Sequence, residues 1–162
     1  MGSGLENLEV LNDAQQIADE LWSRVSAWNG LARDVVGLQL ARAVDSIGAN
    51  IAEAFGRFHY ADKIRFLYYA RGSLFEAKFW IDRANRRGLI PPQEATDWDA
   101  RLTEVARKLN ALVRDLRLRS QTAQRSSRAI HEPAVEASYS LDSPTDDLIL
   151  DEDRGLLAVP DD

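Results

Sequence analysis

Ser46-Ile47-Gly48-Ala49-Asn50-Ile51-Ala52-Glu53-Ala54-Phe55-Gly56-Arg57 is the stretch of this chain that is most informative about its fold. Apolar side chains recur in and around it at steps of three or four residues, which is the spacing of one face of an α-helix. Polar side chains recur at the same steps on an adjoining face. Polar groups so close to a core must have hydrogen-bond partners or serve a function. The stretch therefore predicts a packed helix whose polar side has a role of its own. The apolar positions are Val44, Ile47, Ile51, Phe55 and Phe58, and the polar positions are Ser46, Asn50, Glu53 and Arg57.

The same periodicity continues along the chain and predicts four long helices. Gly30 and Gly88 are stop signals, and Pro92 suits a first helical position. No segment shows the alternation of a β-strand, and the links are short. We therefore expect an all-α fold, an antiparallel up-down-up-down four-helix bundle. The helices are predicted at residues 5–29, 31–58, 61–87 and 92–119.

Each predicted helix carries one apolar stripe, and together the stripes form the predicted core. The inward positions are Val10, Ala14, Ile17, Leu21, Val25 and Trp28; Val36, Leu40, Val44, Ile47, Ile51, Phe55 and Phe58; Ile64, Leu67, Ala70, Leu74, Ala77, Ile81 and Ala84; and Trp98, Leu102, Val105, Leu109, Leu112 and Leu116.

The charge of the chain is divided between a body and a tail. The net charge is -6, but residues 1–119 carry 17 basic and 16 acidic side chains, whereas residues 120–162 carry 3 and 10. We therefore predict a flexible leader at residues 1–4, the bundle at residues 5–119 and an acidic tail of low order at residues 120–162.

Two interpretations of the tail remain open. It is either a disordered solubilising segment or a short linear motif that docks on a partner or on the basic surface of this protein. In the second case Leu148, Ile149 and Leu150 are the anchors, because they lie inside an acidic run.

The usual signatures of catalysis are missing from the sequence. There are no cysteines, and neither His59 nor His131 has a Glu three residues before it, as a di-iron bundle requires. Phosphate-binding glycine loops and nucleophile elbows are also missing. No apolar run has the length of about 18 residues that a membrane span needs. We therefore expect a cytoplasmic protein that is not an enzyme and has no cofactor, metal, membrane contact or small-molecule substrate.

The polar stripe has three interpretations. Ser46, Asn50, Glu53 and Arg57 could join Ser73 and Glu76 of the third helix in a hydrogen-bond network that fixes register. The same residues could line a surface between subunits. A catalytic carboxylate pair, Glu53 with Glu76, is the third interpretation.

The third predicted helix has more aromatic side chains than one core face needs. A wide core stripe would explain them, but a second buried surface explains them better, and we expect homo-oligomerisation. The residues are Phe66, Tyr68, Tyr69, Phe75, Phe79 and Trp80.

Two motifs separated by one helix turn resemble a known family. Ser46-Ile47-x-x-Asn50-Ile51-Ala52-Glu53 with Gly56-Arg57, followed by Phe66-Leu67-x-x-Ala70-x-Gly72-Ser73-Leu74-x-Glu76, is similar to the four-helix-bundle S23 family. Its members include proteins encoded by intervening sequences in 23S ribosomal RNA genes and accessory variability determinants of diversity-generating retroelements. The resemblance covers residues 8–118, with Ala54 where the family commonly has Gly.

The resemblance implies a barrel-like homopentamer, and for the retroelement members it implies binding to a reverse transcriptase and to nucleic acid. We therefore expect a non-enzymatic oligomeric accessory or scaffold protein that binds a protein partner, with RNA or DNA as a further ligand. The alternative is a protein-only interaction module that acts through its acidic tail. Candidate phosphate-binding residues are Arg83, Arg86, Arg87, Arg114, Arg117 and Arg119.

Overall fold

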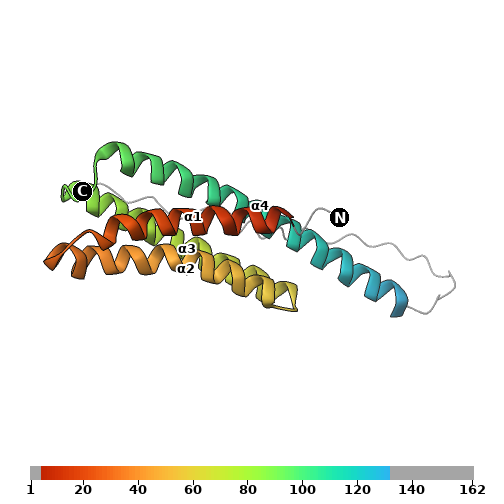
Figure 1. The fold of residues 1–162 in the computed structure, drawn as a ribbon. Helices are drawn as coiled ribbons and strands as arrows, with labels where there is room; N and C mark the ends of the chain where they lie inside the picture. Colours follow the sequence, from red (N-terminus) through yellow and green to blue (C-terminus); the bar gives the residue numbers. More distant parts are fainter. Residues whose placement is uncertain (1–4, 132–162) are drawn as a thin grey trace, which may run out of the picture.

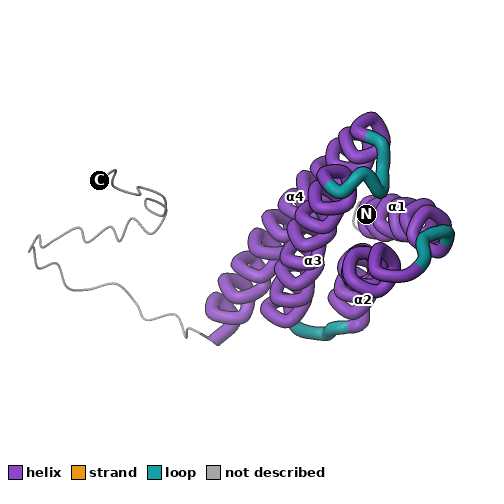
Figure 2. Tube along the Cα trace, turned by 90° about the vertical axis from the view of Figure 1, so that its left-hand side faces the viewer, coloured by secondary structure: helices purple, strands orange, loops and turns teal. Residues whose placement is uncertain are grey.

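The computed structural model describes residues 5–131, and every regular element within that range is a helix (Figure 1). Four long helices run alternately up and down, with α1 and α2 on one side of the bundle and α3 and α4 on the other (Figure 2). This confirms the predicted all-α four-helix bundle. The elements are α1 (Leu5–Ser26), the π-helix η1 (Ala32–Gly37), α2 (Leu38–Gly56), α3 (Tyr60–Arg86) and α4 (Pro92–His131).

A single apolar core fills the space between the helices. It contains most of the inward positions that the periodicity predicts, and no polar or charged side chain is buried among the described residues. Full burial of a Leu or Ile side chain contributes about 1.5–3 kcal/mol, so this core is the main source of stability. The largest side chains that are completely buried are Ile17, Leu21, Leu40, Ile47, Ile51, Leu67, Leu74, Leu102 and Leu109.

The chain enters the second helix through a π-helical segment, whereas the sequence predicts a regular α-helix from residue 31. The segment ends at Gly37, which is buried against α1. A Cβ atom added to Gly37 would lie 2.7 Å from Cγ1 of Val25 and 3.4 Å from Cε3 of Trp28. Glycine is therefore needed here because the backbone of the second helix approaches the end of the first closely.

The predicted end of the second helix is wrong. α2 ends at Gly56, and the backbone of Arg57 is extended, with φ -79° and ψ 141°. Phe58 consequently lies in the turn with 90% of its surface exposed, and Phe55 is also exposed, so neither belongs to the core. Ala54 is the last buried residue of α2, because it follows Ile51 by three residues on the inward face.

The fourth helix is longer than predicted. α4 continues past Arg119 to His131, and its far end protrudes beyond the other helices (Figure 1). Residues 120–131 contain neither Gly nor Pro, so nothing in this polar stretch stops the helix. Residues 132–162 lie outside the described range, and with them the predicted anchors Leu148, Ile149 and Leu150. In the described residues, no helix has the length and apolarity that crossing a membrane requires.

Candidate interaction surfaces

A chain of hydrogen bonds connects α2 to α3. The Asn50 Nδ2 group donates to the Ser46 carbonyl at 2.8 Å and to Ser46 Oγ at 3.0 Å. The two hydroxyl oxygens of Ser46 and Ser73 are 2.9 Å apart, and Ser73 donates to the Tyr69 carbonyl at 3.1 Å. The Ser46 hydroxyl must then donate to Ser73, because each hydroxyl has a single proton. This relay brings three of the six predicted stripe residues together across the helix pair.

The other three stripe residues lie apart from this relay. Glu53 forms an ion pair with Arg57, which directly follows the end of α2, and the Arg57 guanidinium lies 4.6 Å from the ring centre of Phe66. Glu76 is exposed and has no hydrogen-bond partner among the described residues. Glu53 and Glu76 therefore share no hydrogen bond among the described residues.

The seam between α1 and α4 is closed by ion pairs that the sequence analysis missed. Arg101 donates two hydrogen bonds to the Glu20 carboxylate, one of them at 3.0 Å, and Trp98 Nε1 donates to Glu20 at 3.4 Å. The bonds from Arg101 hold the pKa of Glu20 below its ordinary value. Lys108 donates to Asp13 at 2.7 Å, and this bond raises the pKa of Lys108.

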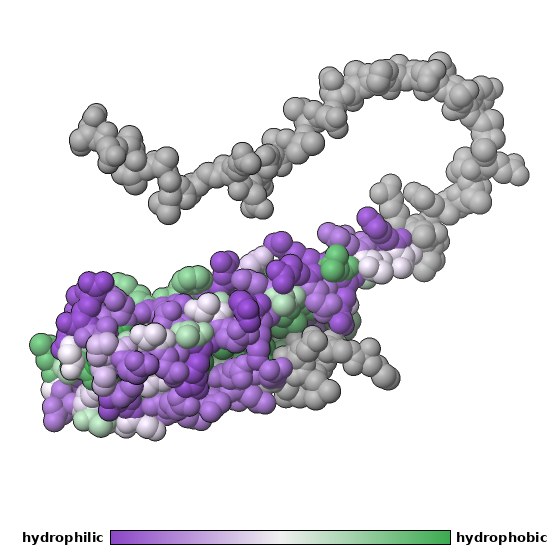
Figure 3. Space-filling view, turned by 90° about the horizontal axis from the view of Figure 1, so that it is seen from above, coloured by the Kyte–Doolittle hydropathy of each residue, from purple (hydrophilic) through white to green (hydrophobic). Residues whose placement is uncertain are grey.

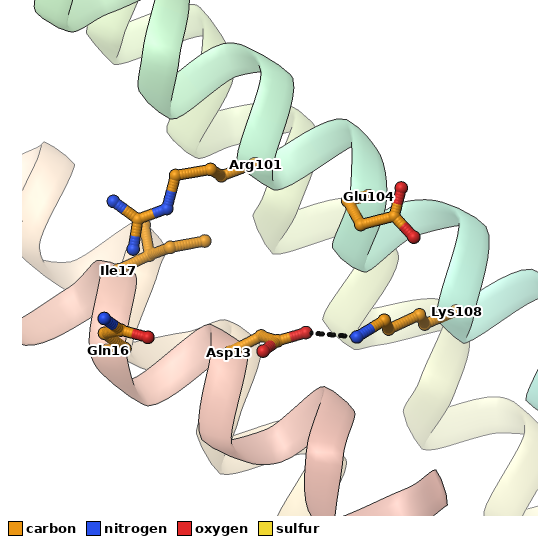
Figure 4. Close-up of a pocket in the computed structure, with 6 residues that line it drawn as sticks. All are labelled: Asp13, Gln16, Ile17, Arg101, Glu104 and Lys108. Carbon is orange, nitrogen blue, oxygen red and sulfur yellow. Dashed lines mark hydrogen bonds and ion pairs between the residues drawn. The ribbon is translucent and has the colours of Figure 1, made fainter.

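A cleft of about 240 Å³ opens along this seam (Figure 4). Its charged groups are satisfied mainly by each other: Lys108 faces Asp13 across the cleft, and Arg101 is held by Glu20. The cleft is therefore part of the seam that the ion pairs between α1 and α4 close. Two regular stripes could have revealed it, namely Glu9, Asp13, Gln16 and Glu20 on α1 and Asp97, Arg101, Glu104 and Lys108 on α4.

The two predicted arginine clusters do not form one surface. Arg117 donates to the Tyr68 hydroxyl at 2.6 Å, which places the second cluster beside the start of α3. Arg86 lies 18 residues after Tyr68 on α3, or about 27 Å further along the helix axis. Arg86 is also paired with Asp82 at 2.8 Å, and Arg119 with Asp115 at 2.8 Å.

Aromatic side chains form an exposed ridge on the outward face of α3. Tyr68, Phe75 and Phe79 follow one another at steps of seven and four residues, and their exposed fractions are 39%, 54% and 55%. Gly72 lies between them, and a Cβ atom added there would meet nothing within 4 Å. We call Tyr68, Gly72, Phe75 and Phe79 the α3 ridge. Apolar patches also interrupt the mostly hydrophilic surface in Figure 3.

The remaining predicted aromatic residues of α3 divide between the core and the surface. Phe66 and Trp80 are half-buried and pack against the core, whereas Tyr69 is 53% exposed. The excess of aromatic side chains on this helix is thus partly a wide core stripe and partly a face that a single bundle leaves in water.

The comparisons with known proteins identify the family. The family model for the 23S rRNA-intervening sequence protein matches residues 6–111. The chain belongs to this family. The match runs from the start of α1 to the middle of α4, so the protruding end of α4 lies beyond it. A comparison with curated protein sequences found no match.

A solved structure shares the fold. It is the crystal structure of a protein of unknown function from the S23 ribosomal protein family of Bacteroides thetaiotaomicron. The two chains are 23% identical, with a TM-score of 0.62, and the alignment covers 67% of this chain and 98% of the other. At this identity the likeness shows the fold alone.

Proposed function

We propose that this 23S rRNA-intervening sequence protein is a non-enzymatic homo-oligomeric scaffold that binds a protein partner. The observation that supports it is the α3 ridge, where Phe75 and Phe79 are each more than half exposed. Covering about 100 Å² on each ring would contribute about 2.5 kcal/mol per ring before the costs of association. Such a face is typical of a surface that another chain covers.

A second apolar patch lies where the second helix begins. Leu31, Val35 and Leu38 follow one another at steps of four and three residues, and their exposed fractions are 79%, 43% and 47%. A ring of identical subunits needs two different complementary patches on each copy, because its contacts run head to tail. The ridge of one copy against this patch of the next would meet that requirement. The resemblance in the sequence favours five copies and, if the chain is a retroelement accessory protein, a reverse transcriptase as the protein partner.

Native mass spectrometry and sedimentation velocity of the full chain test the assembly. We expect a homo-oligomer for the natural sequence and a monomer for the double variant Phe75→Ser, Phe79→Ser. Leu118→Ser is the matched control, because it removes an apolar side chain that is 64% exposed outside the ridge. A monomeric natural protein would refute the assembly, and an unchanged mass of the double variant would refute the role of the ridge.

Nucleic-acid binding is a second candidate function, favoured by the charge of α4. Between Leu109 and Ser126 this helix has four exposed arginines and a single carboxylate, Asp115. Guanidinium groups bind phosphate oxygens in pairs of hydrogen bonds, which suits an RNA or DNA backbone. The four arginines are Arg114, Arg117, Arg119 and Arg125.

The anisotropy of a fluorescent DNA duplex tests this second function. Four phosphate contacts, one for each arginine, give a salt slope of about -3.6, so the affinity should fall about 150-fold between 50 and 200 mM salt. Arg114→Ala with Arg125→Ala should weaken binding, whereas Arg83→Ala with Arg87→Ala should have a smaller effect. A duplex that does not bind at 50 mM salt would exclude this function for double-stranded DNA, and an RNA hairpin is the second probe.

A further inference from the structure

The outward face of α4 is basic and is covered by no part of the described bundle. Five residues make up this face, and they follow one another along the helix at steps of four, three, four and seven. They lie on the side of α4 opposite its buried positions. All of them are exposed, including Leu118, which is 64% exposed. We call this surface the α4 basic face: Arg107, Ala111, Arg114, Leu118 and Arg125.

The positive charge of this face has little compensation inside the bundle. Arg107 is 2.5 Å from Glu104, but neither Arg114 nor Arg125 has an ion pair with a described residue. The helix dipole stabilises cations only within the last turn, and Arg107 and Arg114 lie more than four turns before His131. Like charges on one helix face repel each other, so an acidic ligand would stabilise this face.

We propose that the acidic segment of residues 146–153 of the same chain docks on the α4 basic face. The segment reads Asp146-Asp147-Leu148-Ile149-Leu150-Asp151-Glu152-Asp153, so five carboxylates surround three apolar side chains. Its carboxylates complement the exposed guanidinium groups, and its apolar side chains complement the exposed Leu118 and the neighbouring Ala111. The α4 basic face and the acidic segment thus both combine charged with apolar side chains, and their charges are of opposite sign.

The length of chain between the two elements permits this contact within one molecule. Asp146 lies fifteen residues after His131, and an extended chain of that length spans about 50 Å. Arg114 lies seventeen residues before His131 on the same helix, which is about 26 Å. The tether is therefore longer than the path back along α4, even to Arg107 at about 36 Å.

Tethering also raises the local concentration of the segment. A tether of this length would hold its end at an effective concentration in the millimolar range, so even a weak ionic contact would be populated. Exposed charges are screened beyond about 10 Å at 0.1 M salt, so the docked population should fall as salt rises. The docked segment would compete with phosphate groups for Arg114 and Arg125. The docking itself does not depend on either proposed function.

Spin-label distance measurements on the full chain test the docking. The natural chain has no cysteine, so Ser143→Cys with Asn110→Cys, a position beside the face and outside it, gives one unique labelled pair. If the segment were undocked, the helix from Asn110 to His131 and the following link would give a broad distribution near 35 Å. Docking should give a narrower one below about 25 Å, since both labels would then lie at or beside the same face. Ser143→Cys with Ala49→Cys, an exposed position on α2, is the matched control and should stay broad.

Two further variants make the result decisive. Replacing the five carboxylates by Asn or Gln should return the Ser143–Asn110 distribution to the broad, long form, and so should Arg114→Glu with Arg125→Glu. The labelled natural chain is measured alone and with an excess of unlabelled protein, and a short distance that survives this dilution reports one molecule. The proposal is overturned if the natural chain gives the broad form, if the carboxylate variant keeps the short distance, or if dilution with unlabelled protein abolishes it.

Discussion

Gly72 offers a test that separates the stability of the single bundle from its assembly. It lies in the interior of α3, at the centre of the α3 ridge, and a Cβ atom there would meet nothing within 4 Å. In the single chain Gly72→Ala therefore gains helix propensity without a steric cost, and we expect about 0.5–1 kcal/mol of stabilisation. For a bundle of this size this raises the midpoint of thermal unfolding by about 2–6 °C.

A bulky residue at the same position should have the opposite effect on assembly. If a neighbouring subunit packs on the ridge, Gly72→Trp places a large ring where the two surfaces must approach. Overpacking of a fitted contact costs about 1–3 kcal/mol, which weakens each contact about 5- to 150-fold. The single bundle should tolerate the ring, because the site is open to solvent.

Urea unfolding over a dilution series, together with sedimentation velocity, measures both effects. Gly48→Ala is the matched control: it also replaces an interior helical glycine, and its Cβ atom would make ordinary contacts of 3.8 Å with Gln15 and Leu11. We expect Gly48→Ala to keep the assembly and Gly72→Trp to dissociate it. If Gly72→Trp sediments like the natural protein, the α3 ridge is not the interface. If Gly72→Ala destabilises the monomer, the outward face of α3 is assigned incorrectly.

Two smaller predictions concern the seams of the bundle. The folded-state pKa of Glu20 is lowered, so its ion pair with Arg101 stabilises the fold above the ordinary pKa of a glutamate, and this contribution is lost as pH falls through the lowered value. The free energy of unfolding, measured with urea, should therefore fall as pH is lowered through this range. Glu20→Gln should make that fall smaller by about 0.2–1 kcal/mol, and an unchanged pH profile would contradict the pairing. Ser73→Ala should cost about 0.5–1.5 kcal/mol in the same assay, because it breaks the relay from Ser46.

The inward faces of the helices could be predicted because burial follows the helical period directly. Leu67, Leu74 and Ile81 are apolar at steps of seven residues, and no polar residue competes for that face. The period does not show where a helix ends. Phe58 continues the apolar spacing, yet it lies beyond the end of α2 and in solvent. The polar residues 120–131 resemble a linker in composition, but they contain neither Gly nor Pro, the residues that break a helix.

The contacts between helices were harder to predict than the helices themselves. Both Ser46 and Ser73 lie beside the apolar stripes of consecutive helices, and their hydroxyl oxygens are 2.9 Å apart. It does not show that Glu53 pairs locally with Arg57, because a local partner competes with a partner across the bundle. The close approach of Gly37 to Val25 depends on how two helices meet, and no single-helix pattern encodes it.

Each proposed role of this protein belongs to a different part of the bundle surface. Ion pairs close the α1–α4 seam and hydroxyl groups connect α2 to α3, so most of the polar side chains at these two seams are paired with each other. The α3 ridge and the α4 basic face remain, and they consist of different residues on two helices that pack against each other. Because linked weak sites reinforce one another, a ring would convert a weak anion site on each copy into tight binding of an extended polyanion, and release of the docked tails would then control access to it.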